Sequence, residues 1–262
     1  MSDILDRIIT DKRREVALKK ALIPVAQLEA STLFERPTLS LASRLRESLT
    51  GIIAEHKRRS PSRAVINHDL SVYDVAAGYE KAGVCGISVL TDGKYFGGSP
   101  EDLWLARAST SVPLLRKEFI IDEYQLIEAR AYGADVILLI ASVLTREEIK
   151  SFSELARSLS LEVLLEVHNE EELHKSVMPS LDMLGVNNRN LKTFEVSIET
   201  SEKLSALIPD DFVKVSESGI SDHNTITGLR DFGYRGFLVG ENFMKTGNPG
   251  ESAAAFIRKL TT

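Results

Sequence analysis

Short runs of apolar residues recur along the chain, and stretches with helical spacing separate them. The runs have the length of single β-strands and cover residues 51–57, 86–90, 112–119, 135–141, 162–168, 183–188, 213–219 and 236–243. The stretches between them repeat apolar residues at helical intervals and cover residues 69–83, 99–110, 122–133, 145–160, 169–176, 197–208, 221–233 and 249–260. The pattern therefore predicts eight strands, each followed by a helix.

Most of these runs are apolar on both faces, which is typical of parallel strands covered by helices. Eight such units in succession predict a closed (β/α)8 barrel, the TIM-barrel fold. A doubly wound open sheet is the alternative, but no GxGxxG sequence follows the first run and no break in rhythm suggests a reversal of strand order. We expect one domain spanning residues 1–262, in which residues 46–262 form the barrel and residues 1–45 add a helical extension.

Capping residues mark several of the predicted helix boundaries. Side chains that accept hydrogen bonds from the first N–H groups of a helix precede four of the stretches: Asp122, Thr145, Asn169 and Ser221. Glycines suited to the left-handed conformation after a helix follow three of them: Gly83, Gly133 and Gly233. These signals agree with the periodicity and support the same alternation.

Composition narrows the class of protein. The chain has 262 residues, of which 43% are hydrophobic and 27% charged, with a formal net charge of −6, as in an ordinary water-soluble globular protein. No apolar run approaches the roughly 20 residues of a membrane helix, and the N-terminus lacks the features of a signal or transit peptide. Residues 1–20 therefore predict an amphipathic helix, with an apolar face formed by Ile4, Leu5, Ile8 and Ile9.

The single cysteine, Cys85, excludes an intrachain disulfide and favours a cytoplasmic location. The basic cluster HKRRSPSR, residues 56–63, raises the question of nucleic acid. The acidic overall balance, without a second basic stripe or an aromatic platform, argues against that function. We expect no nucleic-acid or membrane partner.

Charged and amide side chains end several predicted strands on the face that points into the barrel. Side chains alternate across a strand, so Glu55 and Lys57 share the face of Ile53, and Lys117 shares that of Leu115. The same parity places further polar residues at the mouth: Glu166, Asn187, Arg189 and Glu217. Active sites of such barrels lie at the carboxyl ends of the strands, and buried charges cost stability unless they pair. This converging set therefore predicts a binding or catalytic pocket.

Two segments after the last two predicted strands favour a phosphate site. They read SESGIS, residues 216–221, and VGENF, residues 239–243. Barrels commonly bind phosphate there through backbone N–H groups, and Gly219 and Gly240 let the backbone approach an anion.

Other residues have structural alternatives. Phe96, in the glycine-rich loop after the second run, is either a loop anchor or a wall for a flat substrate. His168 is interpreted as a residue at a helix start, and Trp104 as a helix packing residue. The five histidines show no metal-ligand spacing, so no metal is expected.

In order and spacing, several motifs resemble those of the indole-3-glycerol phosphate synthase family. They are IIAEHKRRSPS, SVLTDGKYFGGS, LLRKEFIID, EARAYGADVILLI, LLEVHNEEEL, LGVNNRNLKTF, VSESGI and FLVGENFM. The resemblance covers nearly the whole chain, and KRRSPS and NNRNL are its most specific parts, whereas SESGI and GADVILL recur in other barrels. It implies a (β/α)8 enzyme of tryptophan biosynthesis.

The resemblance implies a carbon–carbon lyase of the carboxy-lyase class, without metal or cofactor. Its small phosphorylated substrate is 1-(2-carboxyphenylamino)-1-deoxy-D-ribulose 5-phosphate, whose indole ring is closed with release of carbon dioxide and water. By motif match, Lys117 resembles the general acid, Glu166 the base of the later dehydration, and Lys57 a second acid that contacts the substrate. We expect Lys57 and partial burial to lower the pKa of Lys117, as this role requires.

Further positions resemble family residues that bind the substrate. Those implied to orient it are Glu55, Asn187 and Glu217; those implied to contact its carboxylate or sugar hydroxyls are Ser60 and Arg189. The implied apolar walls for its aromatic ring are Phe96 and Phe119, and the implied phosphate ligands are Ser218, Gly219, Gly240 and Glu241.

Four positions depart from the family's usual residues. Glu118 replaces an aspartate, but parity points its side chain away from the pocket. His56 replaces an apolar residue, on the helix-facing side, and Ala64 replaces a glycine. Glu241 replaces a serine, and its carboxylate would repel a phosphate, so its backbone N–H is the expected contact.

Two alternative functions remain to be weighed against the synthase. A phosphoribosyl isomerase-like barrel would not be expected to place two lysines and a glutamate on the first, third and fifth strands in these contexts. A non-catalytic phosphosugar-binding barrel would lack one of Lys57, Lys117 or Glu166, and all three are present. The oligomeric state stays open, and a monomer is compatible with the sequence.

Overall fold

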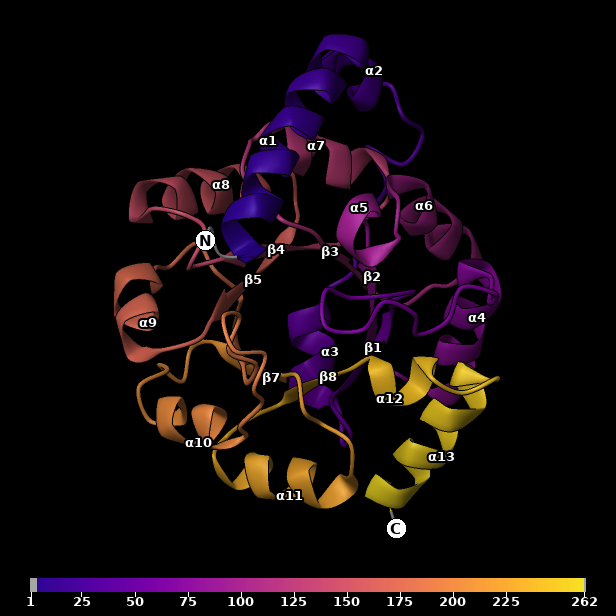
Figure 1. Ribbon diagram of the computed structural model, residues 1–262, viewed down its shortest axis with the longest axis vertical. Coiled ribbons are helices and arrows are strands. Elements are labelled where there is room, and N and C mark those ends of the chain that lie inside the picture. Colours follow the sequence, from indigo (N-terminus) through magenta and orange to yellow (C-terminus); the bar gives the residue numbers. More distant parts are fainter. Residues whose placement is uncertain (1–3, 262) are drawn as a thin grey trace.

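The computed structural model describes residues 4–261, which contain a closed barrel of eight parallel strands (Figure 1). Each strand pairs with its neighbours in sequence, and β1 closes the ring by pairing with β8. The predicted (β/α)8 barrel is confirmed, and the doubly wound sheet is wrong. The strands are β1 (Ile52–His56), β2 (Gly86–Leu90), β3 (Leu114–Lys117), β4 (Val136–Ile140), β5 (Glu162–Val167), β6 (Met183–Asn187), β7 (Val213–Glu217) and β8 (Gly236–Val239).

Helices surround this ring, and every predicted helical stretch contains one. They are α4 (Val72–Ala82), α6 (Pro100–Ser109), α7 (Tyr124–Ala131), α8 (Arg146–Ser158), α9 (Glu170–Ser176), α10 (Glu199–Ser205), α11 (His223–Asp231) and α13 (Pro249–Thr261). Two short helices occupy the loops after β2 and β8: α5 (Gly93–Phe96) and α12 (Glu241–Met244). Between residues 4 and 261, no helix has the length and apolar character needed to cross a membrane.

The strands divide the core into two layers, as their alternation predicts. The inner layer fills the barrel and includes Ile53, Leu115, Leu164 and Val215, all fully buried. The outer layer lies between strands and helices and includes Val163, Leu165 and Val167. The parity deduced from the sequence is therefore confirmed, so the residues at the ends of these strands point where the sequence placed them.

The N-terminal extension touches both ends of the barrel through α1 (Ile4–Leu22), α2 (Val25–Glu29) and α3 (Leu41–Glu47). Helix α3 closes the amino ends of the strands, behind the centre of the ring in Figure 1. The Glu162 carboxylate, at the start of β5, accepts the backbone N–H of Leu41 at 2.8 Å and that of Ala42 at 3.0 Å. Residues 1–3 of the helix predicted over residues 1–20 lie outside the described part of the chain.

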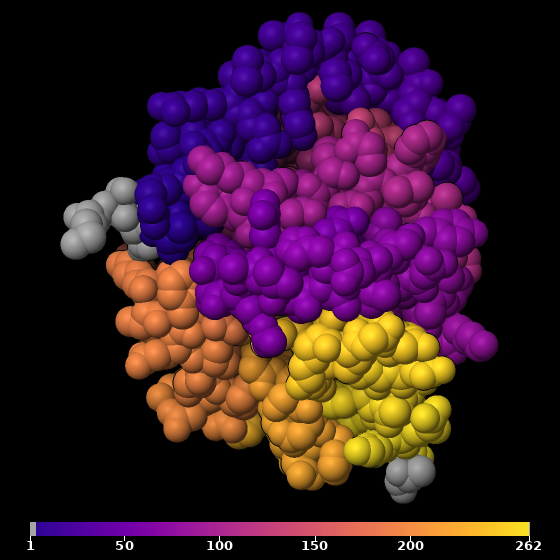
Figure 2. Space-filling model, turned by 45° about the vertical axis from the view of Figure 1, so that its right-hand side comes forward, coloured from indigo at the N-terminus to yellow at the C-terminus, as the bar shows by residue number. Residues whose placement is uncertain are grey.

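Helix α1 lies at the opposite end, where the strands have their carboxyl ends. Figure 2 shows this indigo segment packed against the magenta middle of the chain. Lys12 fastens it there: the ammonium is almost fully buried and lies 2.9 Å from Asp92, 3.0 Å from Glu118 and 2.8 Å from Glu15. Burial alone would lower the pKa of Lys12, but these carboxylates raise it above the ordinary value.

Two of the predicted N-caps need correction. Ser221 is not an N-cap, because Asp222 accepts the N–H groups of Asn224 and Thr225 at the start of α11. Helix α7 begins after Glu123 rather than after Asp122, although Asp122 still accepts the N–H of Tyr124 at 2.9 Å.

Trp104 is 55% exposed, so its interpretation as a packing residue is wrong. The buried face of α6 is formed by Asp102, Leu103 and Ala106, and position 104 follows Leu103 by one step around the helix. The caps Thr145 and Asn169 and the left-handed glycines 83, 133 and 233 are confirmed.

Replacing Lys12 by methionine is expected to lower the free energy of unfolding by about 3–5 kcal/mol, because it leaves buried carboxylates without their cation. The matched control is Lys20→Met on the same helix, where the ion pair with Asp122 is about half exposed and should contribute less than about 1 kcal/mol. Urea unfolding measures both values, and equal losses in the two variants would contradict this role of Lys12.

Candidate functional site

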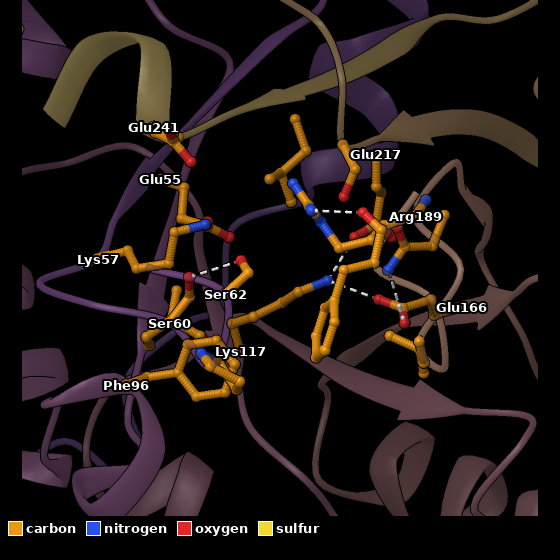
Figure 3. Close-up of a pocket in the computed structure, with 18 of the residues that line it drawn as sticks. Glu55, Lys57, Ser60, Ser62, Phe96, Lys117, Glu166, Arg189, Glu217 and Glu241 are labelled. Carbon is orange, nitrogen blue, oxygen red and sulfur yellow. Dashed lines mark hydrogen bonds and ion pairs between the residues drawn. The ribbon is translucent and has the colours of Figure 1, made fainter. Parts of the chain in front are cut away.

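A cavity of about 440 Å³ opens at the carboxyl ends of the strands (Figure 3). All candidate residues named from the sequence line it: Glu55, Lys57, Ser60, Phe96, Lys117, Phe119, Glu166, Asn187, Arg189, Glu217, Ser218, Gly219, Gly240 and Glu241. Its size is in the range of small-molecule sites.

Lys117, the last residue of β3, is at the centre of the polar groups. Its ammonium lies 2.8 Å from Glu166 Oε2 of β5 and also hydrogen-bonds to Glu217 Oε2 of β7. Figure 3 shows the lysine extending from its strand toward these two carboxylates across the cavity. One cation is thus shared by two buried carboxylates.

The charge state of Lys117 differs from the sequence-based expectation. Burial opposes its charge, but Glu166 and Glu217 outweigh burial and raise the pKa of the ammonium well above its ordinary value. The expected lowering by Lys57 is therefore wrong. Lys57 is occupied with Glu55, whose Oε1 lies 2.7 Å from its ammonium.

The two carboxylates around Lys117 have opposite tendencies. Burial alone would raise the pKa of Glu166, but Lys117 and His168 hold it well below the usual range. Burial, together with the charge of Glu166, raises the pKa of Glu217 to about 7, although Lys117 opposes this shift. Two carboxyl groups with such different pKa values in one pocket can take different roles, one accepting a proton and the other donating one.

Two glycines, one within β6 and one directly after β8, make room for carboxylates. A Cβ at Gly185 of β6 would lie 2.4 Å from Glu217 Oε1, and one at Gly240 would lie 2.6 Å from Glu55 Oε1. Both distances are shorter than nonbonded contacts allow. The glycines at these positions are therefore a requirement of the site rather than of the strands.

The end of β6 orients its neighbours. Asn187 donates its side-chain N–H to Glu166 Oε1 at 3.1 Å and accepts the backbone N–H of Arg189 at 3.0 Å. The Arg189 guanidinium donates to the Phe194 carbonyl at 3.0 Å. Lys117 and Asn187 thus both donate to Glu166 from within the cavity.

One side of the cavity is apolar and aromatic. Phe96 in α5 and Phe119 after β3 lie with ring centroids 6.0 Å apart at a tilt of 41°. Ile4, Leu5 and Ile8 of α1 also line the cavity, a role that sequence reasoning missed. Their helical spacing indicated an apolar face but not what it covers.

The loops after β7 and β8 form the opposite side. Ser218 and Gly219 have consecutive positive φ angles of 67° and 79°, which turn the backbone at the rim. Glu241 is paired with Arg63 of the β1–α4 loop, so its carboxylate is neutralised in part. Sequence reasoning also missed Asn242 and Lys245, which line the same side.

The basic cluster after β1 has intramolecular partners. Arg58 binds Asp102 and, at 3.0 Å, the Gly97 carbonyl; Arg59 binds the Gly93 carbonyl at 2.7 Å. These contacts tie the β1–α4 loop to α5 and so place Ser60 at the cavity rim, where its hydroxyl lies 3.2 Å from that of Ser62. Within the described chain, no group of three or more His, Cys, Asp or Glu side chains is arranged as a metal site.

Comparison with known proteins gives one consistent family. The family model described as indole-3-glycerol phosphate synthase matches residues 5–260. An indole-3-glycerol phosphate synthase of Bacteroides thetaiotaomicron is 46% identical over 260 residues, which is 99% of this chain and 100% of the relative. That of Dechloromonas aromatica is 43% identical over 258 residues, covering 97% of this chain and 98% of the relative.

More distant solved structures share only the fold. The structure of KGPDC from Streptococcus mutans superposes with a TM-score of 0.61 at 13% identity, covering 82% of this chain and 98% of that chain. Thiamine phosphate pyrophosphorylase from Pyrococcus furiosus gives a TM-score of 0.61 at 15% identity, covering 85% of this chain and 100% of that chain.

Replacing Glu217 by glutamine, which mimics its protonated form, is expected to stabilise the protein at alkaline pH. With a pKa near 7 in the fold against an ordinary value of 4.5, the wild-type loses stability as pH rises from 4.5 through 7. Between pH 5 and pH 8 the variant should gain roughly 2–3 kcal/mol over wild-type in urea unfolding. Exposed Glu199→Gln is the control, and parallel pH curves for wild-type and Glu217→Gln would contradict the shift.

Proposed function

Because the chain belongs to the indole-3-glycerol phosphate synthase family, enzymes of tryptophan biosynthesis, we propose that it closes the indole ring of 1-(2-carboxyphenylamino)-1-deoxy-D-ribulose 5-phosphate. The reaction forms one carbon–carbon bond and releases carbon dioxide and water, which makes the protein a carboxy-lyase among the carbon–carbon lyases. Its partner is this small phosphorylated molecule.

The observation behind this proposal is the shared ammonium of Lys117. In the free protein Glu166 and Glu217 keep this cation protonated. When the neutral ketose carbonyl replaces one carboxylate as its acceptor, part of the negative charge that raises the Lys117 pKa is gone, so the bound ammonium is a stronger acid than in the free protein. As the aromatic carbon attacks the carbonyl carbon, the carbonyl oxygen gains negative charge and takes the proton of Lys117. Such general acid catalysis typically contributes about 10²- to 10⁴-fold to the rate.

The remaining steps use the other groups of the pocket. Carbon dioxide leaves and its bonding electrons restore the aromatic ring. Lys57 then protonates the departing hydroxyl group as water, while Glu166, kept ionised by its surroundings, accepts the proton that the new ring gives up. No metal or cofactor is needed, because these side chains supply every proton transfer.

The two ends of the cavity suit the two ends of the substrate. The aromatic ring packs against the wall formed by Phe96 and Phe119, and its carboxylate binds Ser60 and Arg189. Glu55, Asn187 and Glu217 face the sugar between the two ends. Holding both ends brings the two reacting carbons together, and this proximity lowers the barrier in addition to acid–base catalysis.

The phosphate binds backbone N–H groups at Ser218, Gly219, Gly240 and Glu241. The ion pair with Arg63 reduces the repulsion that the Glu241 carboxylate would otherwise exert, and Lys245, which lines the same end, adds positive charge there.

The extension and the barrel act as one domain in this proposal. Residues 1–45 supply the α1 wall of a pocket whose polar groups come from residues 46–262. We also propose a cytoplasmic location, which the free thiol of Cys85 supports.

Purified protein dialysed against EDTA is expected to convert the carboxyphenylamino ketose phosphate into a product with indole fluorescence. Folded protein that gives no fluorescence with or without added divalent metal would contradict the activity. Fluorescence that depends on added metal would contradict the metal-free route.

Lys117→Ala is expected to lower kcat by about 10²-fold or more while substrate binding stays measurable, because the carbonyl loses its proton donor. Lys203→Ala, on an exposed lysine of α10, is the control. Steady-state kinetics give both constants, and near-normal turnover of Lys117→Ala would remove this residue from the mechanism.

Gly219→Leu is expected to raise KM more for the phosphorylated ketose than for its dephosphorylated analogue. A Cβ at this position would lie 2.5 Å from Val196 Cγ1 and would displace the loop that binds the phosphate. Gly83→Leu is the matched control, since Gly83 has a similar φ of 85° but an added Cβ would meet no atom within 4 Å. Equal effects on both ketoses would argue against a phosphate site here.

A further inference from the structure

His168 lies directly behind the carboxylate of Glu166. Its Nε2 is 3.3 Å from Glu166 Oε1, an ion-pair contact, and its Nδ1 is 3.1 Å from Glu172 Oε2. The side chain is 11% exposed and is not part of the cavity lining. An imidazole in this position touches the base but not the substrate.

Glu172, the second partner, is held in place by the start of α9. Its Oε2 accepts the backbone N–H of His168 at 2.8 Å, and its Oε1 accepts the side-chain N–H of Asn169 at 2.9 Å. Asn169 in turn accepts the backbone N–H of Glu172 at 2.9 Å, as the N-cap of the helix. The imidazole of His168 therefore contacts a carboxylate, that of Glu172, whose position the helix cap fixes.

The charges around Glu166 explain why a cation behind it matters. Among residues 4–261, the ammonium groups paired with Glu55, Glu166 and Glu217 in the centre of the cavity are those of Lys57 and Lys117. In the proposed reaction, Lys117 turns to the substrate carbonyl and gives up its proton. Glu166 then loses its nearest cation while it is still buried, a situation that favours protonation of the carboxylate.

We propose that His168 is a positioning residue for this reaction: held as an imidazolium between two carboxylates, it orients Glu166 and keeps it ionised while Lys117 is engaged with the substrate. Its ion pair and the hydrogen bond from Asn187 both involve Oε1 of Glu166, which leaves Oε2 for the proton transfer. The inference rests on the proposed role of Glu166 as the base.

The electrostatic balance at His168 agrees with this geometry. Burial alone would lower the pKa of His168, but Glu166 and Glu172 outweigh it and raise the pKa to about 10. Glu166 from β5 and Glu172 from α9 are the charged groups that face the ring; Lys117 from β3 and Asn187 from β6 meet the far side of Glu166. The interpretation of His168 as only a residue at a helix start is thus incomplete.

The first test measures kcat against pH for His168→Asn, with the fluorescence assay. The variant is expected to lose roughly 10- to 100-fold in kcat, as is usual when the partner behind a functional group is removed, with KM little changed. The acid limb of its kcat profile should move upward by about one pH unit or more, because Glu166 loses an opposite charge. His168→Gln, whose longer side chain brings an uncharged amide donor to the Nε2 position that Asn does not reach, should recover part of kcat but not the position of the acid limb.

The matched control is His174→Asn on α9, the helix that also carries Glu172. His174 also pairs with a glutamate four residues away, Glu170, at 3.2 Å, but both side chains are 64% exposed and neither lines the cavity. This variant should leave kcat and the acid limb unchanged. A His168→Asn profile parallel to wild-type, or a loss confined to KM, would overturn the positioning role.

The second test does not depend on activity. A ¹⁵N NMR titration of the histidine rings, with the His168 signal assigned by its loss in His168→Asn, should show a doubly protonated ring well beyond pH 8, and Glu172→Gln should lower its pKa. A ring that titrates near its ordinary 6.5 would overturn the inference.

Failure of the proposed function would look different. Wild-type protein that does not close the ring would contradict the proposed function. An active Glu166→Gln variant would contradict the role of Glu166 as the base. In either case the NMR titration still decides whether His168 is held as a cation.

Discussion

The structure depends on one constraint: charges buried at the mouth of the barrel must satisfy each other. Lys117 is shared by Glu166 and Glu217, and Lys57 is held by Glu55. Each pair is nearly closed to solvent, where an unpaired charge would cost several kcal/mol. A substrate with anionic ends can enter such a site because it exchanges partners with these groups instead of leaving them unpaired.

The surrounding fold is arranged to keep that cluster in place. Gly185 and Gly240 remove the Cβ atoms that would collide with carboxylates, and Asn187 orients Glu166 from the next strand. Lys12 fixes α1 over the mouth through Asp92, which also caps the short helix that positions Phe96. The aromatic wall and the N-terminal helix therefore share one buried ionic anchor.

Strand order, the two core layers and the gathering of the candidate residues could be predicted, because they follow from the alternation of side chains along each strand. The pKa of Lys117 could not, since it depends on which carboxylates of other strands reach the ammonium. The apolar face of α1 was visible in the sequence, but its position over the pocket is set by Lys12, through a contact with Asp92 that is distant along the chain. The prediction for Trp104 was wrong because a large apolar residue on a helix can point either to the core or to solvent.

The proposed chemistry depends on a Lys117 that its two carboxylates hold protonated in the free enzyme. A ¹⁵N NMR titration of the lysine side-chain ammonium groups, with Lys117 assigned by a Lys117→Arg variant, tests it directly. The Lys117 signal should remain that of an ammonium at pH values above the ordinary lysine pKa of 10.5. Loss of the Lys117 proton below that value would show that the two carboxylates do not hold it as a cation.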